Sequence, residues 1–340
     1  MRIGVLGAGA IGTYVGAKLL LAGHEVVLVG RLGKEIAEHG ITLSDHTGAS
    51  ASVPASRVTY VEAPEALADS DAVLVTVKSM ATEDAARPLA SILKRRTTIV
   101  SLQNGVSNAP RLRAVLPEHD VLAGMVPFNV ARTGPGHFHN GTDGPLAIER
   151  RGGIEKPIAA ALRDAKFDVE TRSDIEGVQW SKLVVNLNNA VNALAGVPIR
   201  AQLADRKYRL VMAACVREAL AATRAAGIVL ARVGKMIPSL APIVLSLPNA
   251  IFFTVARTMV KVDPQAKSSM LDDLERKRVT EVDYLNGEIV RLADAHGVSA
   301  PANRAVVLLV KAAEVKREGS PRMSSSALLD AVSPRDEARA

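Results

Sequence analysis

The sequence predicts an α/β fold with a doubly wound parallel sheet, followed by an all-helical region. Up to Thr171, short apolar runs typical of buried strands alternate with helical segments, as in a parallel sheet with helices on both faces. After Thr171 the strand-like runs stop and long amphipathic helices follow. We therefore expect domains at 1–173 and 174–317. A flexible tail is expected at 318–340, where Ser, Pro and charged residues show little periodicity.

The expected elements follow from apolar runs and from the residues that punctuate them. Short, continuously apolar runs predict strands at 2–6, 25–29, 71–77, 97–102 and 121–126. Helices are expected at 11–22, which Gly23 closes, and at 81–95. A glycine- and proline-rich stretch predicts a β-hairpin edge within 127–150, before a helix at 156–166 and a strand at 167–171. Amphipathic periodicity predicts helices at 174–195, 205–227, 268–296 and 301–317, with a proline-broken stretch at 237–262.

Composition excludes several classes of protein. Of 340 residues, 48% are hydrophobic and 23% are charged, which excludes a disordered or fibrous chain. The single cysteine, Cys215, excludes a disulfide framework and a multi-cysteine metal site, and we expect no bound metal. Aromatic residues make up only 3%, too few for a base-stacking surface, so we expect no nucleic-acid partner. The net charge of +7 suits small anionic ligands such as phosphates and carboxylates.

Two apolar segments bear on the compartment. Residues 1–29 could pass for a signal peptide, but the glycine spacing and the interior Lys18 and Glu25 argue against one. Residues 237–256 carry no charge over 20 positions, but three prolines divide them into pieces too short to span a bilayer. We expect buried short helices or an oligomer surface there, with membrane association as the alternative. The expected protein is cytoplasmic and homodimeric.

A glycine motif directly follows the first expected strand and opens the first helix. Gly7-Ala8-Gly9-Ala10-Ile11-Gly12 matches G-x-G-x-x-G in the context that identifies a dinucleotide-binding loop. Gly7 permits the tight turn, Gly9 lets a pyrophosphate approach the backbone, and Gly12 lets helix and strand pack closely. The helix N-terminus offers free N–H groups to the phosphates.

The residue after the second strand indicates which dinucleotide binds. NAD-binding sites usually carry Asp or Glu there to hold the ribose 2′-hydroxyl, whereas this chain carries Arg31. A guanidinium suits a 2′-phosphate through bidentate, charge-assisted hydrogen bonds. The sequence therefore favours NADP(H), with Lys34 as a possible second cation; an ordinary surface arginine is the alternative.

Polar residues also follow two further strands. Lys78 directly follows the strand expected at 71–77, and Asn104 follows the strand expected at 97–102. Ligands of open α/β sheets bind beyond the carboxyl ends of the strands, so both residues are candidates for the site. Asn104-Gly105 is also a turn dipeptide, which is the structural alternative for Asn104.

The apolar segment 180–196, which covers most of the helix expected at 174–195, carries one lysine and four asparagines. Lys182, Asn186 and Asn189 share one helix face, whereas Asn188 and Asn192 point elsewhere. Asparagine is a poor helix former, so this pattern indicates a buried polar site. A desolvated lysine has a lowered pKa and can donate a proton near neutral pH. For Asn188 and Asn192 we favour hydrogen bonds to the backbone of neighbouring helices.

In combination, these segments resemble the ketopantoate reductases (2-dehydropantoate 2-reductases), a family of the 6-phosphogluconate dehydrogenase-like class. The resemblance covers residues 1–317 and rests on the order and spacing of its motifs. The matching segments are GxGxxG at 7–12, Arg31, VTVKS at 75–79, QNGV at 103–106, WSKLVVN at 180–186, SSMLDDL at 268–274, TEVDYLNG at 280–287, and AHGV and P-x-N within 295–303.

The resemblance implies a Rossmann-like NADP-binding domain and the NADPH-dependent reduction of a 2-oxo acid, as in pantothenate biosynthesis. It implies that Lys182 is the general acid that protonates the developing alkoxide. Glu281 positions the substrate hydroxyl and couples to Lys182. The remaining implied roles are substrate binding by Asn186, Asn189 and Ser269, and a position between cofactor and substrate for Asn104 and Lys78.

Two departures from the family pattern concern the substrate. Ala190 and Ala266 stand where the family commonly carries asparagines, and the stretch 231–266 looks longer than in compact members. The alternatives are therefore reduction of a different 2-oxo acid on the same scaffold, or a non-catalytic NADP(H) sensor. The presence of both Lys182 and Glu281 argues against the sensor.

Overall fold

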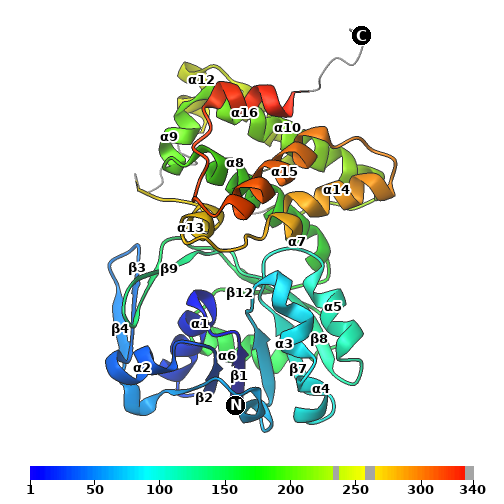
Figure 1. Cartoon of the computed structure of the whole chain (residues 1–340). Coiled ribbons are helices and arrows are strands. Elements are labelled where there is room, and N and C mark those ends of the chain that lie inside the picture. The colour runs from blue at the N-terminus through cyan, green and yellow to red at the C-terminus, as the bar shows by residue number, and fades with distance from the viewer. Residues whose placement is uncertain (233–236, 257–264, 334–340) are drawn as a thin grey trace. The chain divides into compact units, whose positions relative to one another are not determined.

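The structure is a computed structural model that describes residues 1–232, 237–256 and 265–333. The chain divides into two compact units, Met1–Gln179 and Trp180–Ala340, and the boundary falls inside helix α7 (Ile175–Asn186) (Figure 1).

The first unit is built around an eight-stranded sheet with the order β12-β11-β8-β7-β6-β1-β2-β5. All neighbouring strands are parallel except β11 and β8. The strands are β1 (Arg2–Leu6), β2 (Glu25–Val29), β5 (Thr59–Val61), β6 (Ala72–Val75), β7 (Thr98–Ser101), β8 (Asp120–Met125), β11 (Leu146–Glu149) and β12 (Val169–Arg172). The sheet confirms the predicted α/β class, and the five strands predicted from apolar runs alone are β1, β2, β6, β7 and β8.

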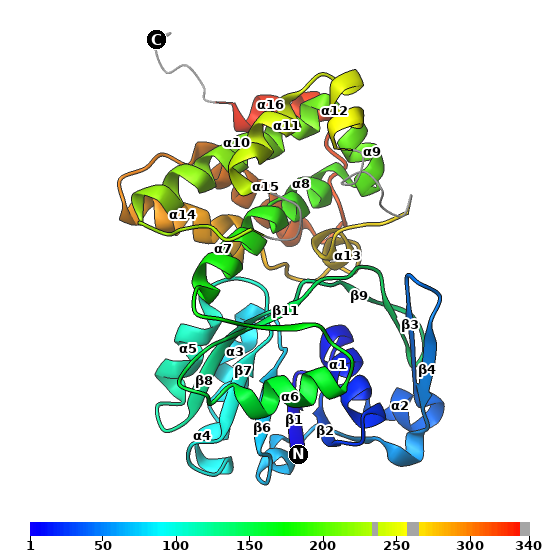
Figure 2. The ribbon, with the colours of Figure 1, turned by 180° about the vertical axis from the view of Figure 1, so that it is seen from behind.

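Helices cover both faces of this sheet because its central strands are apolar on both sides. On one face lie α1 (Ala10–Leu21) and α6 (Lys156–Asp164) (Figure 2). On the other lie α3 (Thr82–Ala86), α4 (Leu89–Ile92) and α5 (Asn108–Val115) (Figure 1). Helix α2 (Gly33–His39) follows β2. The helical stretch predicted at 81–95 exists as two short helices, α3 and α4. Pro88 lies between them, because proline lacks the N–H that a continuous helix needs.

A second sheet of four strands has the order β4-β3-β10-β9. Its strands are β3 (Ile41–Asp45), β4 (Ser50–Val53), β9 (Val130–Gly134) and β10 (His137–Asn140). The predicted hairpin in 127–150 exists as β9 and β10, but it does not form an edge of the main sheet. Instead β10 pairs in parallel with β3, a strand that the sequence analysis did not predict. Local patterning cannot identify such a partner, which is distant along the chain.

The second unit consists of helices. They are α8 (Asn188–Ala195), α9 (Ile199–Ala204), α10 (Arg206–Ala225), α11 (Ala241–Ser246), α12 (Asn249–Val255), α13 (Ser269–Glu275), α14 (Asn286–Ala295), α15 (Pro301–Lys316) and α16 (Ser325–Val332), together with the 3₁₀ turns η4 (Pro238–Leu240) and η5 (Val282–Tyr284). The helices predicted at 205–227 and 301–317 correspond to α10 and α15. Among the described residues after 174, every regular element is helical, which agrees with the predicted class.

Two long helices predicted in this unit are interrupted. The helix predicted at 268–296 divides into α13, η5 and α14. Helix α13 ends before Lys277, whose φ of 56° lies in the left-handed region, so the chain leaves the helical path there. The helix predicted at 174–195 divides into α7 and α8 at Leu187, whose φ of −56° and ψ of −26° still continue the right-handed winding.

The prediction of a flexible tail from residue 318 is wrong over 318–333. The Ser324 hydroxyl accepts a hydrogen bond from the Ala327 N–H and caps α16, and Leu328 and Val332 are buried. The Tyr208 hydroxyl on α10 donates to the Met323 carbonyl at 2.6 Å. Capping and two buried apolar side chains therefore order a segment whose composition looked unstructured. Residues 334–340 of the predicted tail lie outside the described residues.

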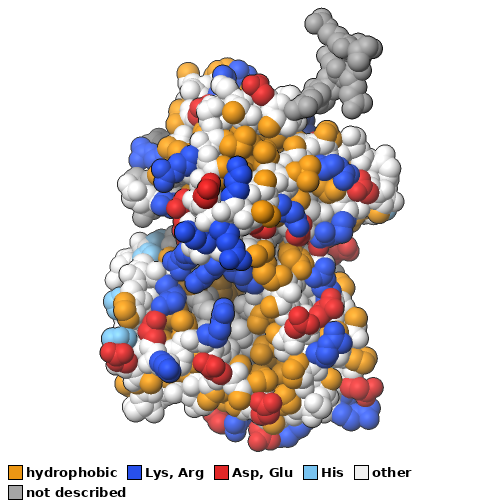
Figure 3. Space-filling view, viewed as in Figure 1, with side chains coloured by type: hydrophobic (Ala, Val, Ile, Leu, Met, Phe, Trp, Pro, Cys, Tyr) orange, Lys and Arg blue, Asp and Glu red, His pale blue; other side chains and the backbone are white. Residues whose placement is uncertain are grey.

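The proline-broken stretch forms η4, α11 and α12 up to Val255, and residues 257–262 of the predicted stretch lie outside the described residues. The short helices are partly buried: Leu245 and Phe252 are buried, whereas Ile243 and Val255 are 63% and 58% exposed. An oligomer surface at the exposed side chains stays a prediction. Within the described residues, no helix is long and apolar enough to cross a membrane. Elsewhere the visible face of each unit mixes charges of both signs (Figure 3). Surface ion pairs of the chain include Arg95–Glu118 and Arg304–Asp294.

A fully buried arginine holds this stretch against α10. The Arg209 guanidinium donates to the carbonyls of Leu203, Leu245 and Leu247 at 2.7–3.1 Å and to Asn249 Oδ1 at 2.9 Å, and it lies 4.0 Å from the centroid of the Phe252 ring. Because α11 and α12 are too short to be stable alone, these bonds fix their position.

Replacing Arg209 by methionine is expected to lower the free energy of unfolding by about 2 kcal/mol, because it leaves buried carbonyls without donors. Urea unfolding followed by circular dichroism measures the change. The matched control is Arg206→Met, since the Arg206 side chain is exposed and donates to a single carbonyl of this stretch, that of Ser246. An equal decrease in the free energy of unfolding in both variants would show that the buried hydrogen bonds of Arg209 stabilise the protein no more than the exposed bond of Arg206.

Candidate functional site

The glycine loop between β1 and α1 adopts a conformation that requires its glycines. Gly7 has a φ of 87°, and a Cβ atom there would lie 2.6 Å from the Val77 backbone nitrogen. A Cβ atom at Gly12 would collide with the Thr76 hydroxyl and lie 2.9 Å from Val5 Cγ1. These are the roles expected of the first and third glycines, namely a tight turn and close helix–strand packing.

Space remains beside the middle glycine. A Cβ atom at Gly9 would meet only the Gly7 carbonyl oxygen, at 3.9 Å. The first N–H groups of α1, from Ala10 to Gly12, have no partner within the helix, because no preceding turn supplies a carbonyl. The loop thus provides an open backbone surface beside a helix N-terminus, which fits the pyrophosphate of a dinucleotide.

Side-chain hydroxyls bind the carbonyl groups of this loop. Thr76 Oγ1 donates to the Gly7 carbonyl at 2.9 Å, and Thr13 Oγ1 donates to the Ala8 carbonyl at 3.1 Å. The Tyr60 hydroxyl also donates to the Ala8 carbonyl. The sequence analysis missed all three residues, since no motif marks a hydroxyl that acts through a backbone carbonyl. Their bonds hold the loop so that its carbonyls face the protein.

Arg31 and Lys34 lie at the start of the segment that follows β2, and both side chains are exposed. Neither forms an ion pair with another described residue. The nearby carboxylate of Glu35 is engaged: it binds the Arg132 guanidinium at 2.5 Å and accepts the Gly136 N–H at 2.8 Å. Two cations are therefore available at the position where the sequence predicts recognition of a 2′-phosphate, while the adjacent acidic group is already neutralised.

Lys78 and Asn104 lie beyond the carboxyl ends of β6 and β7, which are neighbours in the sheet, and both are exposed. Hydrogen bonds tie the two loops together. Gln103 Nε2 donates to the Val77 carbonyl at 3.0 Å, and Ser79 Oγ donates to the Asn104 carbonyl at 3.1 Å. The structure thus places both residues at the sheet edge where the sequence analysis expected them.

Lys182 and Asn186 lie one turn apart on α7. Around them the helix is largely apolar, and its side chains Trp180, Leu183 and Val184 are buried. Asn186 is only 9% exposed. Burial lowers the pKa of the Lys182 ammonium from its ordinary value, because desolvation disfavours the charged form. A half-buried lysine with a lowered pKa is suited to proton transfer.

Asn189 on α8 lies next to the start of α13. Ser268 Oγ donates to the Asn189 carbonyl at 3.1 Å and accepts the Leu271 N–H at 3.1 Å, which caps α13. The next residue is Ser269, the exposed first residue of that helix. The structure therefore brings the segments of Asn189 and Ser269 together. The break between α13 and α14 means that Ser269 and Glu281 do not lie on one continuous helix.

Glu281 precedes η5, and its backbone is firmly held. Its carbonyl accepts the Tyr284 N–H at 2.9 Å, and the preceding Thr280 N–H donates to Glu314 Oε1 at 2.7 Å. Helix α15 packs against both η5 and α8, so the segments that carry Glu281 and Asn189 border the same helix.

Asn192 and Asn188 have structural roles. Asn192 is fully buried, donates to the Val197 carbonyl at 2.8 Å and accepts the Ser268 N–H at 2.9 Å. This confirms the preferred interpretation for Asn192. Asn188 Oδ1 instead accepts a bond from the side chain of Gln202, at 2.7 Å.

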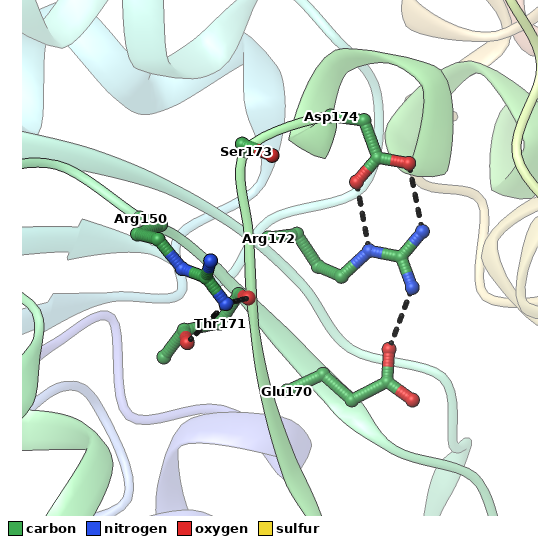
Figure 4. A pocket seen from close by; sticks show the side chains of 6 residues that line it. All are labelled: Arg150, Glu170, Thr171, Arg172, Ser173 and Asp174. Carbon is green, nitrogen blue, oxygen red and sulfur yellow. Dashed lines mark hydrogen bonds and ion pairs between the residues drawn. The ribbon is translucent and has the colours of Figure 1, made fainter.

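A pocket at the carboxyl end of β12 is an unconvincing alternative site (Figure 4). Its cation, Arg172, is bound to both oxygens of Asp174, at 2.8 and 2.7 Å, and to Glu170 at 3.0 Å. A second arginine, Arg150, donates to the Thr171 carbonyl at 3.0 Å. The arginines thus fix the turn that leads into α7.

Comparison with known proteins gives consistent results over most of the chain. The family model described as "Ketopantoate reductase PanE/ApbA" matches residues 3–153, and the model of its C-terminal part matches residues 174–314. The 2-dehydropantoate 2-reductase of Archaeoglobus fulgidus is 31% identical over 320 residues, which cover 92% of this chain and 98% of that protein. The enzyme of the same name from Escherichia coli O157:H7 is 28% identical and covers 95% of this chain and 99% of its own length.

Solved structures agree. A PanE/ApbA family ketopantoate reductase from Ralstonia eutropha JMP134 superposes with a TM-score of 0.80 at 33% identity, covering 94% of this chain and 100% of that one. A ketopantoate reductase from Staphylococcus aureus, described as dimeric, has a TM-score of 0.69 at 18% identity, covers 93% of this chain and 100% of that one, and shows the fold alone.

Proposed function

This chain belongs to the ketopantoate reductase family, and on that premise we propose that it reduces 2-dehydropantoate (ketopantoate) to pantoate with NADPH. The observation that carries the proposal is the glycine loop, whose open backbone at Gly9 fits a dinucleotide and is followed by the exposed Arg31. The cofactor-binding residues are Gly7, Ala8, Gly9, Ala10, Ile11, Gly12, Arg31, Lys78 and Asn104.

Bound NADPH supplies a hydride, which adds to the C2 carbonyl carbon of the oxo acid. The pair of electrons of the C=O π bond moves onto oxygen, and the Lys182 ammonium donates a proton to that oxygen. Before the transfer, the same ammonium polarises the carbonyl, so no metal is required. Glu281 positions the new hydroxyl, while Asn186, Asn189 and Ser269 bind the substrate.

A second candidate is the reduction of a different 2-oxo acid. Because Ala190 and Ala266 are alanines, neither position offers a polar side chain to a substrate. Ala190 is fully buried, and the Ala266 carbonyl is already engaged by the Ile199 N–H at 2.9 Å. The fold itself does not select ketopantoate: a D-mandelate dehydrogenase, solved with NADH and anilino(oxo)acetate, superposes with a TM-score of 0.76 at 21% identity and covers 93% of this chain and 99% of that one. Assembly as a homodimer in the cytoplasm remains our expectation.

The test is oxidation of NADPH with a panel of ketopantoate, pyruvate, 2-oxoisovalerate, 2-oxoglutarate and buffer alone. Ketopantoate turnover with a kcat/KM of about 10⁴ M⁻¹s⁻¹ or more supports the proposal. NADPH binding with turnover of another acid supports the second candidate. NADPH binding with no turnover of any acid would point to the sensor.

The rate of reduction is expected to fall as the pH rises. The ammonium form of Lys182 is the acid, so activity is present below its pKa and is lost as the pH passes through it. Because burial lowers that pKa, the loss should occur below the ordinary lysine value of 10.5. The measurement is kcat for reduction against pH. A profile that stays flat up to the ordinary lysine range contradicts this role.

A further inference from the structure

Tyr60 in β5 bridges two parts of the first unit. Its half-buried ring packs against the core, and its hydroxyl donates to the Ala8 carbonyl in the glycine loop. Thr13 donates to the same carbonyl. The tyrosine thus contacts the loop that we propose binds the pyrophosphate.

The same hydroxyl also contacts residues 30–33, here called the Arg31 turn. The Leu32 backbone is near enough to the Tyr60 oxygen to lower the pKa of the phenol, against the larger effect of burial. A Cβ atom at Gly30 would lie 2.6 Å from that oxygen, so only glycine fits beside it. At the far end of the turn, a Cβ atom at Gly33 would lie 3.7 Å from Tyr60 Cδ1. The turn is therefore wrapped around the end of the Tyr60 side chain.

Resting on the proposed function, we propose that Tyr60 is a positioning residue that fixes the Arg31 turn against the glycine loop and thereby determines selectivity for NADPH over NADH. The glycine loop serves both dinucleotides, because both carry the pyrophosphate. The Arg31 turn serves NADPH alone, because only NADPH carries the 2′-phosphate. One oxygen that packs against the turn at Gly30 and donates to the loop at Ala8 sets the spacing between these two contacts.

The bridge acts by preorganisation. Burial raises the pKa of the Tyr60 phenol, so the hydroxyl keeps its proton and remains a donor. Without the bridge, the Arg31 turn samples other positions in the free protein, and NADPH must select the competent one at the expense of affinity. NADH lacks the 2′-phosphate, so its affinity depends less on that position.

The test is Tyr60→Phe in the full-length chain, with Kd for NADPH and NADH measured by isothermal titration calorimetry. The variant keeps the ring and the Thr13 bond to Ala8, so it should fold. We expect Kd for NADPH to rise about tenfold and Kd for NADH to rise about threefold or less. Once NADPH saturates the variant, kcat should equal that of the unaltered protein.

Tyr208→Phe is the matched control. Its hydroxyl donates to a backbone carbonyl, that of Met323, as Tyr60 does to Ala8, but it lies in the second unit. Both variants should lower the melting temperature, and only Tyr60→Phe should change the ratio of the two dissociation constants. An unchanged ratio with a lowered melting temperature would show that Tyr60 is merely structural.

The outcomes separate this inference from the function on which it rests. If the unaltered protein prefers NADPH and Tyr60→Phe keeps the same preference, the role of Tyr60 is refuted and the proposed function stands. If the unaltered protein binds neither dinucleotide, the proposed function fails as well, and the inference fails with it.

Discussion

Replacement of Lys182 by alanine is expected to lower kcat for ketopantoate reduction by about 10²- to 10⁴-fold, the usual contribution of a positioned general acid. The reason is specific to this side chain. Its helix is apolar, and burial lowers its pKa, so the ammonium releases its proton more readily than a solvated lysine. Steady-state kinetics at saturating NADPH measures the effect.

Affinity for NADPH should change little in this variant, because the proposed cofactor loop belongs to the other unit of the chain. Lys182→Arg separates charge from proton transfer, since arginine keeps the charge but does not release its proton. We expect it to be nearly as slow as the alanine variant.

The control is Lys207→Ala, which removes an exposed lysine of the same unit that binds the Ser326 hydroxyl. It should leave kcat unchanged. Nearly full activity of the Lys182→Ala variant would show that Lys182 is not the general acid. Another group would then have to donate the proton.

Replacement of Arg31 by aspartate is expected to reduce the preference for NADPH over NADH by about 100-fold or more. The change removes charge-assisted hydrogen bonds to the 2′-phosphate and introduces repulsion. It also places a carboxylate where a ribose 2′-hydroxyl can bind, which favours NADH. The ratio of kcat/KM values for the two cofactors measures the preference.

Arg87→Asp is a suitable control because it makes the same change of charge at an exposed residue of the first unit, at the end of α3. It should leave the cofactor ratio unaltered. A ratio that Arg31→Asp does not change would mean that Arg31 is an ordinary surface residue. Equal shifts in both variants would mean that long-range charge, and not a contact, sets the preference.

Local signals in the sequence were sufficient for several features. The strand–glycine–helix arrangement at residues 2–21 could be recognised because positive φ and close packing restrict these positions to glycine. Central strands such as β1 and β6 were visible because both faces of a parallel strand are buried, so the whole run is apolar. The positions of Lys78 and Asn104 followed from the rule that parallel strands end at one edge.

Contacts between segments that are distant along the chain decided the rest. The pairing of β10 with β3 joins segments about 95 residues apart, and no periodicity encodes a partner. The order in α16 depends on burial of Leu328 and Val332 and on a bond from Tyr208. The hydroxyls of Thr13, Tyr60 and Thr76 support the glycine loop through backbone carbonyls, which every residue has.

Sequence alone therefore determined the fold class, the glycine loop and the candidate residues Arg31 and Lys182, because each is marked by its chemical type and its local spacing. Glu281 became a candidate only through the resemblance to the ketopantoate reductases. Tertiary structure alone decided which groups hold these residues in place. The physical reason is that a hydrogen bond or a packed side chain depends on distance in space. That distance is set only when the whole unit folds, as the bridge from Tyr60 to the glycine loop shows.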